Sequence, residues 1–507
     1  MQELGAKTTY NRLTQERDDY TQRAEKCATY TIPKAFPKES DNSSTTYDTP
    51  YNSVGARGVN NLASKLLLAL LPPSQPFFRL GLDTENQQKM DQADPDTKEQ
   101  IDYGLSMMEQ AMMRYIESIS FRPTLFDALK QLIISGNALL FLPPKEGGVK
   151  CYHLRDYVVE RDGTGNILQI VTKDTVSKGS LPENLLEYME NADDAEINEK
   201  VDIYTHVFRV NQGESYQWQS YQEINEQVVE GSEQTFPMNK LPWIPIRFFK
   251  RDGESYGRSF IDDYLGDLIS LENLSKAIVD ISMLSAKVIF LVSPSCQTNI
   301  RELAKCENGA FVKGKPEDIM PVQIQKTSDL QVCQATASDI EARLSYCFLL
   351  NSAVQRQGER VTAEEIRYVA GELEDTLGGV YSLLSQELQI PLVNCIFNQM
   401  QSMGMLPADA NIGENIEPTI ITGLDALGRG ADLQKLVEVT QLIVQFPDGQ
   451  QVLNYSGLFT RIFAAAGIDA NGIIKTPEQA QADINQAQMD AQAIEGANEV
   501  AVNQATQ

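Results

Sequence analysis

The run Gly309-Ala-Phe-Val-Lys-Gly-Lys315 comes closest to a catalytic motif in this chain, because it matches the first seven positions of a phosphate-binding loop. The eighth position of that loop must be Ser or Thr to hold magnesium, and here it is Pro316. A helix with free amides aimed at a phosphate also cannot start directly at Pro316-Glu-Asp318. We therefore predict an exposed β-turn that presents Lys313 and Lys315, and no nucleotide site.

Carboxylates and histidines give no further support for catalysis. The pairs Asp262-Asp263 and Glu372/Glu374 could bind a metal or act as acid and base, but no third ligand converges on them. A solvated helix face is the better interpretation of both pairs. The two histidines, His153 and His206, lie in strand-like contexts without ligand partners, which favours structural roles. No Gly-x-Ser-x-Gly elbow is present, so we expect no enzyme, no metal and no cofactor.

Cysteine usage and hydropathy indicate a chain that is made and used without crossing a membrane. The longest apolar runs, 66–71 and 288–292, are far shorter than the roughly 20 residues that span a bilayer. The start is polar and does not resemble a signal peptide. No C-x-x-C pair occurs, which predicts reduced packing thiols in a cytosolic setting. The seven cysteines are Cys27, Cys151, Cys296, Cys306, Cys333, Cys347 and Cys395.

A short polar segment between two helix patterns carries the most conspicuous cationic residues. Apolar residues recur at helical spacing before it, and Thr362 with Glu365 forms a capping box after it. Gly358 marks the point where the backbone can leave helical geometry. The pattern alone is compatible with an ordinary helix-loop-helix corner. The candidate functional residues in and near this segment are Arg343, Gln355, Arg356, Gln357, Gly358, Glu359 and Arg360.

The net charge of −27 argues against a protein that grips nucleic acid, because phosphate neutralisation drives such binding. Two interpretations remain open on charge alone. Acidity could serve only solubility. It could also let a DNA duplex slide past an acidic wall with few cationic contacts, where a basic wall would trap the polymer.

Hydrophobic periodicity predicts helices around one β-rich region at 150–249. Within that region we expect strands at 158–159, 167–171, 201–210 and 243–249, and an inserted helix at 180–191. The remaining expected helices are 1–30, 53–71, two within 94–142 broken near Pro123, 256–291, 339–350, 362–400, 432–445 and 457–466, with a helix-favouring Ala/Gln-rich tail at 477–507. The fold class is therefore α+β, mainly α.

Several long blocks, in order along nearly the whole chain, resemble portal proteins, the head-to-tail connectors of short-tailed bacteriophages. The string QRQGERVTAEEI is similar to the tunnel loop of that family and the helix that follows it. The other blocks are Ala24–Pro73, Leu129–Pro143, Asp252–Leu274 and Glu417–Gly430.

The resemblance implies a portal fold that assembles as a ring of twelve copies. The implied parts are a wing at 1–255, a stem helix at 256–291, a clip at 292–336, a second stem helix at 337–350, a tunnel loop at 351–361, a long wing helix at 362–410, a crown at 411–476, and a helical barrel or disordered tail at 477–507.

The resemblance also implies function and partners. The ring would occupy one capsid vertex of the virion, after assembly in the host cytoplasm with major capsid and scaffolding proteins. It would pass double-stranded DNA without sequence preference through a channel whose residues include Arg343 and the loop residues Gln355–Arg360, and it would make no membrane contact. Its clip would dock the terminase large subunit and later tail adaptor or nozzle proteins through Arg301, Lys305, Lys313 and Lys315. The alternatives are a DNA-translocating ATPase, which would need an intact phosphate loop, and an internal virion structural protein without an annulus.

Overall fold

The structure is a computed structural model, and it separates into two compact units. The first contains 1–67, 123–141 and 150–356, and the second contains 68–122, 142–149 and 357–507. The described residues are 5–38, 40–41, 44–73, 76–83, 86, 95–144, 147–181, 185, 200–212, 215–286, 290–294, 299–303, 305–307, 310–311, 313–321, 327–350, 371, 373, 377–406 and 416–420.

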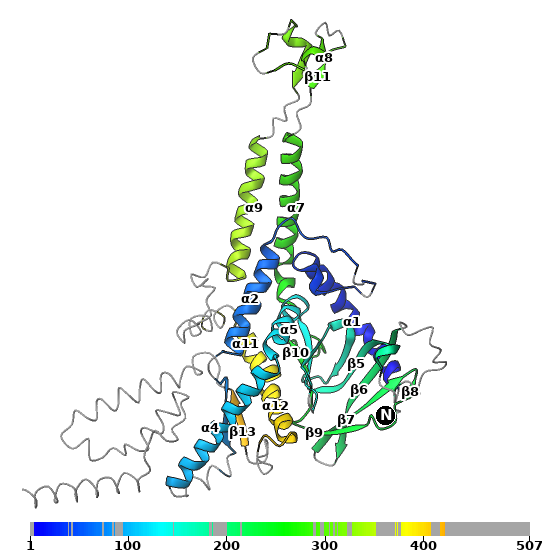
Figure 1. Ribbon diagram of the computed structural model, residues 1–507, viewed down its shortest axis with the longest axis vertical. Coiled ribbons are helices and arrows are strands. Elements are labelled where there is room, and N and C mark those ends of the chain that lie inside the picture. The colour runs from blue at the N-terminus through cyan, green and yellow to red at the C-terminus, as the bar shows by residue number, and fades with distance from the viewer. Residues whose placement is uncertain are drawn as a thin grey trace, which may run out of the picture. The chain divides into compact units, whose positions relative to one another are not determined.

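The first unit combines helices with an antiparallel meander (Figure 1). Its helices are α1 (Ala6–Thr29), most of α2 (Val54–Leu70), most of α5 (Phe121–Ser135), α7 (Phe260–Ala286), α8 (Ile300–Leu303) and α9 (Thr327–Cys347), with short 3-10 turns at Pro33–Ala35, Leu154–Asp156, Lys178–Ser180 and Pro316–Asp318. The strands are β2 (Asn137–Phe141), β3 (Lys150–Tyr152), β4 (Tyr157–Arg161), β5 (Ile167–Ser177), β6 (Lys200–Gln212), β7 (Ser215–Ile224), β8 (Gln227–Val228), β9 (Gln234–Pro237), β10 (Trp243–Arg247), β11 (Phe290–Val292) and β12 (Ile319–Pro321).

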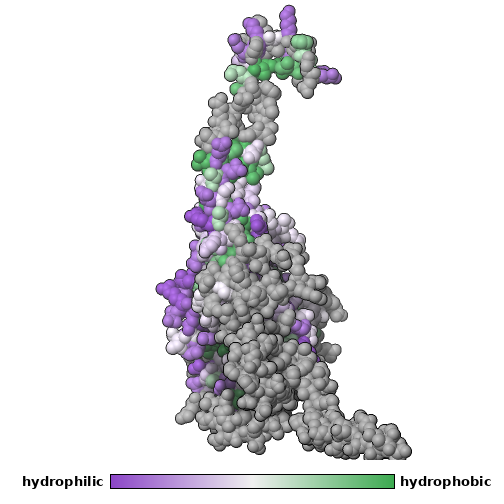
Figure 2. All heavy atoms as spheres, turned by 90° about the vertical axis from the view of Figure 1, so that its left-hand side faces the viewer, coloured by the Kyte–Doolittle hydropathy of each residue, from purple (hydrophilic) through white to green (hydrophobic). Residues whose placement is uncertain are grey.

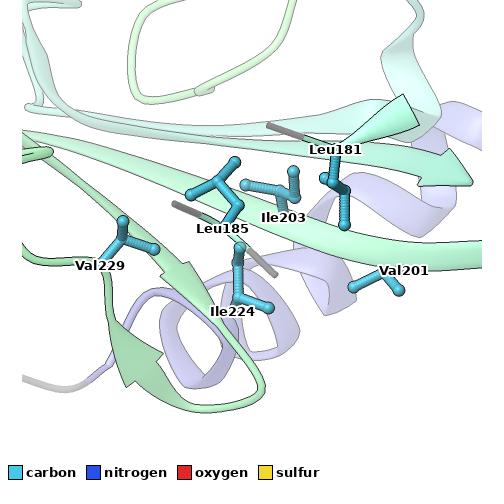
Figure 3. Close-up of a cluster of buried hydrophobic side chains, with 6 residues drawn as sticks. All are labelled: Leu181, Leu185, Val201, Ile203, Ile224 and Val229. Atoms are coloured by element: carbon cyan, nitrogen blue, oxygen red, sulfur yellow. The ribbon is translucent and has the colours of Figure 1, made fainter. Parts of the chain in front are cut away.

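The largest sheet has the order β4-β5-β6-β7-β8, and β9 pairs with β7. Successive side chains of a strand point to opposite faces, so both faces of this sheet can be buried. Helix α1 covers one face, where Tyr10 and Leu13 pack with Val158 and Val171. A second cluster on the other face is drawn in Figure 3 and consists of Leu181, Leu185, Val201, Ile203, Ile224 and Val229.

A carboxylate from the sheet caps the N-terminus of α1. Glu223 on β7 accepts hydrogen bonds from the backbone N–H groups of Ala6 (2.5 Å) and Lys7 (3.1 Å). The first amides of a helix have no partner within the helix, and the helix dipole favours a negative charge there. Gly5 leaves room for this contact, because a Cβ at this position would lie 2.8 Å from the Glu223 carboxylate.

The link from α5 to β2 corrects one sequence prediction, because the second helix within 94–142 ends at Ser135 and does not continue to 142. Gly136 has φ +77°, a left-handed conformation that stops the helix. Asn137 then holds the chain: its Nδ2 donates to the Gly257 carbonyl (2.9 Å) and its Oδ1 accepts from the Gly257 N–H (2.7 Å). Strand β2 lies between β10 and β3.

The helix break predicted near Pro123 is confirmed, because it lies at Ser120 (φ +54°), between α4 (Pro95–Ser118) and α5. Pro123 sits in the first turn of α5, where no amide donor is needed. Two other helix boundaries differ from the prediction. Helix α7 ends at Ala286, and β11 replaces the end of the predicted 256–291 helix. Helix α9 starts at Thr327, twelve residues before the predicted 339.

The second unit contains α4 (Pro95–Ser118), β1 (Phe78–Leu82), α11 (Gly379–Leu384), a π-helical turn at Ser385–Gln389, α12 (Ile390–Ser402) and β13 (Ile416–Ile420). Strands β1 and β13 form an antiparallel pair that the sequence analysis did not predict. Pro391 accounts for the π turn, because its ring would clash with the carbonyl four residues earlier in a regular α-helix.

Side chains within the second unit close the C-terminal end of α2. The hydroxyl of Tyr381 donates to the Ala69 carbonyl (3.1 Å), and Nε2 of Gln389 donates to that of Leu70 (2.8 Å). The Arg122 guanidinium donates to the carbonyls of Leu71 (2.7 Å) and Pro72 (2.9 Å). The last carbonyls of a helix lack intrahelical partners, so these donors stabilise the helix end.

The predicted helix at 180–191 lies almost entirely outside the described residues. So do the predicted helices at 432–445 and 457–466, the tail at 477–507, and the first part of the helix expected at 362–400. Among the residues that the structure describes, no helix is long and apolar enough to cross a membrane. The six cysteines within the described ranges form no disulfide with one another.

Both histidines are structural, as predicted, and they make the fold sensitive to acid. His206 on β6 is 7% exposed and hydrogen-bonds Tyr221 Oη (3.1 Å) and Gln169 Oε1 (2.9 Å). Burial, with a smaller contribution from Arg12, lowers the pKa of His206 to about 4, and burial lowers the pKa of His153 to about 4. The folded state therefore favours the neutral rings.

Stability should consequently fall as pH decreases from the ordinary histidine pKa of 6.5 toward 4, because the unfolded chain binds protons first. The expected loss is on the order of 2 kcal/mol per histidine between about pH 7 and about pH 5. Thermal unfolding midpoints across this range test the prediction. His206→Gln has no titrating ring and should show a shallower pH dependence. Equal slopes for the two proteins would contradict the assignment.

Candidate functional site

Helices α7 and α9 pack side by side along much of their length (Figure 1). Leu268 and Leu271 of α7 and Ile340 and Leu344 of α9 are buried. The two helices are antiparallel in chain direction, because the segment between them carries the chain out along α7 and back along α9. The helices predicted as the two stem helices, at 256–291 and 337–350, overlap this pair in sequence.

The pair buries only part of its apolar surface. Met283 and Leu284 on α7 are 63% and 47% exposed, and Val332 on α9 is 66% exposed. Figure 2 shows hydrophobic atoms among hydrophilic ones on the described surface of this region. A helix that is apolar on more than one face normally packs against more than one partner. The outward residues are therefore suited to contacts with another chain.

The charged residues of the helix pair are mainly acidic. Helix α7 contains five carboxylates and one lysine, and α9 contains three carboxylates and one arginine. That arginine is Arg343, a predicted channel residue, and it forms an ion pair with Asp267 at 3.2 Å. The two side chains are 63% and 37% exposed, so the pair contributes little stability. Asp267 partly neutralises the one cation of α9.

Most of the predicted channel residues, from Gln355 to Arg360, lie outside the described residues. The described chain stops at Leu350, directly after the end of α9. Arg343 is thus the single predicted channel residue whose contacts are described. It lies one turn before the helix end.

The segment between α7 and α9 contains a small antiparallel pair, β11 with β12. All four predicted docking residues, Arg301, Lys305, Lys313 and Lys315, are exposed. Lys315 is followed by the 3-10 turn Pro316–Asp318 and not by an α-helix, in agreement with the rejection of a phosphate loop.

Apolar side chains accompany these cations, and the sequence analysis did not single them out as surface residues. Leu291 is 62% exposed, Met320 is 64% exposed and Phe311 is fully exposed. Sheets of two short strands are rarely stable alone, so this segment too is suited to packing against another chain.

Among the described residues, no group of three or more His, Cys, Asp or Glu side chains could hold a metal ion. Asp262 and Asp263 lie in the first turn of α7, where carboxylates complement the helix dipole. Burial, followed by the neighbouring Asp262, raises the pKa of Asp263. Glu372 and Glu374 lie outside the described residues.

Comparison with known proteins identifies the family. Residues 4–474 match the family of bacteriophage head to tail connecting proteins. The chain is 52% identical to the portal protein of Enterobacteria phage T3 over 95% of this chain and 90% of that protein. It is 50% identical to the portal protein of Escherichia phage T7, over 100% of this chain and 94% of that protein. The chain is 31% identical to the portal protein of Enterobacteria phage SP6, over 85% of this chain and 82% of that protein.

The chain therefore belongs to the family of bacteriophage head to tail connecting proteins. Its role is that of the portal vertex protein of a phage capsid, which is structural and not enzymatic. The resemblance drawn from the sequence blocks is confirmed, including the short-tailed type of phage. The described fold is a mixture of helices and strands, as expected.

Proposed function

We propose that twelve copies of this chain close side by side into a ring whose axial channel is lined by the α7–α9 pairs. The observation that supports this most strongly is the apolar surface that the pair leaves exposed, including Leu284 and Val332. A closed ring requires one face of each subunit to meet a different face of the next. Burial at roughly 25 cal/mol per Å² makes such contacts cohesive. A helix pair with apolar residues on several faces suits this geometry.

The ring would admit double-stranded DNA during packaging and release it during ejection. The acidic residues of α7 and α9 support this role, because a negatively charged wall repels phosphates and lets a duplex slide. Contacts to phosphates position DNA without reading its sequence. Arginines repeated around the axis, Arg343 together with Arg356 and Arg360, would supply these contacts at a tunnel loop spanning 351–361.

The rest of the chain would form the other parts of a portal subunit. Residues 1–255 would form the wing, α7 and α9 the stem, the segment between them the clip, 362–410 the long wing helix, 411–476 the crown, and 477–507 a barrel or tail. The ring would seed procapsid assembly, in the host cytoplasm, with capsid and scaffolding proteins. Its clip would bind the terminase large subunit and later the tail adaptor or nozzle proteins. The exposed cations and apolar side chains of the clip support a docking role.

Ring closure can be tested on the helix pair. Leu284→Asp and Val332→Asp should each reduce assembly at least about tenfold, because a carboxylate would have to be desolvated in an apolar contact. Both positions are exposed in the single chain, so the free energy of unfolding should change by less than about 0.5 kcal/mol. Sedimentation velocity gives the ring fraction. Ser282→Asp and Gln334→Asp are matched controls, since they add the same charge at exposed polar positions. Normal rings from both apolar variants would refute this interface.

The loop arginines can be tested by DNA retention. Arg356→Ala/Arg360→Ala should leave rings intact but lower the amount of genome held in filled heads severalfold, because phosphate contacts at the constriction are lost. Quantitative DNA content of purified particles measures this effect. Arg12→Ala/Arg251→Ala removes the same charge from exposed ion pairs elsewhere and should retain DNA normally. Normal retention by the loop variant would show that the segment does not act as a constriction.

The clip cations can be tested by charge reversal. Lys313→Glu/Lys315→Glu should weaken terminase binding by about tenfold or more and reduce its dependence on salt, because complementary charge contributes to docking. Surface plasmon resonance on assembled rings at two salt concentrations gives both values. Lys26→Glu/Lys200→Glu changes exposed lysines elsewhere by the same charge. Unchanged affinity in the clip variant would remove these two lysines from the docking surface.

A further inference from the structure

The C-terminal end of α9 has an unusual backbone conformation. The N–H of Leu350 donates to the Ser345 carbonyl five residues back (2.8 Å), which closes the helix in the manner of a Schellman cap. The residue between, Leu349, has φ +55°. Glycine normally occupies this left-handed position, because a Cβ crowds the backbone there. The helix therefore ends in a conformation that leucine does not favour by itself.

Two side chains of α2 bind the carbonyls at this helix end. Asn61 Nδ2 donates to the carbonyls of both Phe348 (3.0 Å) and Leu349 (2.9 Å). Lys65 Nζ donates to the Leu349 carbonyl (3.1 Å), and this lysine is only 7% exposed. Amide donors and a cation complement the negative end of the helix dipole. Both side chains bind the Leu349 carbonyl, whose direction follows from the left-handed conformation of Leu349.

Packing of the Phe348 side chain also holds the C-terminal end of α9 in place. Its side chain is fully buried, with its ring 5.7 Å from that of Phe260 on α7. On α2 it lies against Gly58, where an added Cβ would come within 2.4 Å of the Phe348 ring. The ring thus contacts the backbone of α2 directly, and no larger residue than glycine fits at this position.

Helix α2 is itself anchored to α7. The Glu272 carboxylate accepts hydrogen bonds from the N–H groups of Tyr51 (2.9 Å) and Asn52 (3.2 Å) just before α2. The Asn52 side chain then caps the Val54 N–H at 2.7 Å. Since α2 is held by one stem helix and holds the end of the other, the three helices form one braced junction.

We infer that Asn61 and Lys65 are positioning residues of the portal channel: they hold Leu349 left-handed and so set the direction in which the chain leaves α9. Without these donors, Leu349 would relax to the helical region and α9 would continue. Each added helical residue turns the exit by about 100° and shifts it by about 1.5 Å. Arg356 and Arg360 would then start from a different place. The inference rests on the proposed role of the segment that carries those arginines.

The test compares Asn61→Ala with Asn61→Ala/Leu349→Gly in full-length rings. Glycine adopts φ +55° without strain, so it should restore the exit even without the amide donor. Asn60→Ala is the matched control, because Asn60 is exposed and its side chain donates to the Ala56 carbonyl of its own helix (2.9 Å). Hydrogen exchange of a peptide covering 344–350 reports the helix end, and DNA content of filled heads reports the channel.

We expect Asn61→Ala to accelerate exchange at 348–350 about tenfold and to lower DNA retention severalfold while rings still assemble. The double variant should return both measures to near the original values, and Asn60→Ala should change neither. Faster exchange without rescue by glycine would overturn the inference, because Asn61 would then act by general packing. Normal retention by Asn61→Ala would also overturn it.

The loop arginine variant separates the two failures. If Arg356→Ala/Arg360→Ala loses DNA and Asn61→Ala does not, the positioning role fails while the constriction stands. If both variants retain DNA normally, the constriction fails and the positioning role fails with it.

Discussion

The structure depends on the packing of α7 against α9, two helices that bury part of their apolar surface and leave other apolar residues uncovered. Burial of Leu268, Leu271, Ile340 and Leu344 on these helices stabilises the single chain. The remaining apolar surface has no such partner among the described residues of the chain. Apolar helix surface that stays exposed in a single chain is suited to contacts with another chain.

Helix ends held by distant side chains recur through both units. Glu223 caps the start of α1, Asn61 and Lys65 bind the end of α9, and Arg122 with Gln389 binds the end of α2. The unpaired amides and carbonyls of a helix end are costly when buried, so a partner is needed at each. Side chains that meet this need also determine where the chain goes next.

Periodicity predicted α1, α2 and α7 closely, because amphipathic helices show their buried face in the spacing of apolar residues. It missed β2, since a short buried strand and a buried helix segment have the same apolar composition; Gly136 was the available signal. It also missed the first half of α9, where small and polar residues such as Gln334 and Ala335 show no apolar stripe. Strands β1 and β13 were missed because their pairing partners lie more than 300 residues apart. The exposure of Lys313 and Lys315 could be predicted, whereas that of the apolar residues Leu291, Phe311 and Met320 could not.

The sequence by itself determined the family, the acidic character and most helices, because these follow from local composition and from ordered blocks of residues. The tertiary structure alone decided which side chains serve which helix ends. Glu223 and Ala6 are 217 residues apart, and Asn61 and Phe348 are 287 apart. A hydrogen bond forms only when its donor–acceptor distance lies within a few tenths of an ångström of the preferred value. Those distances are set only when the helices and sheets have packed, so no local sequence pattern predicts them.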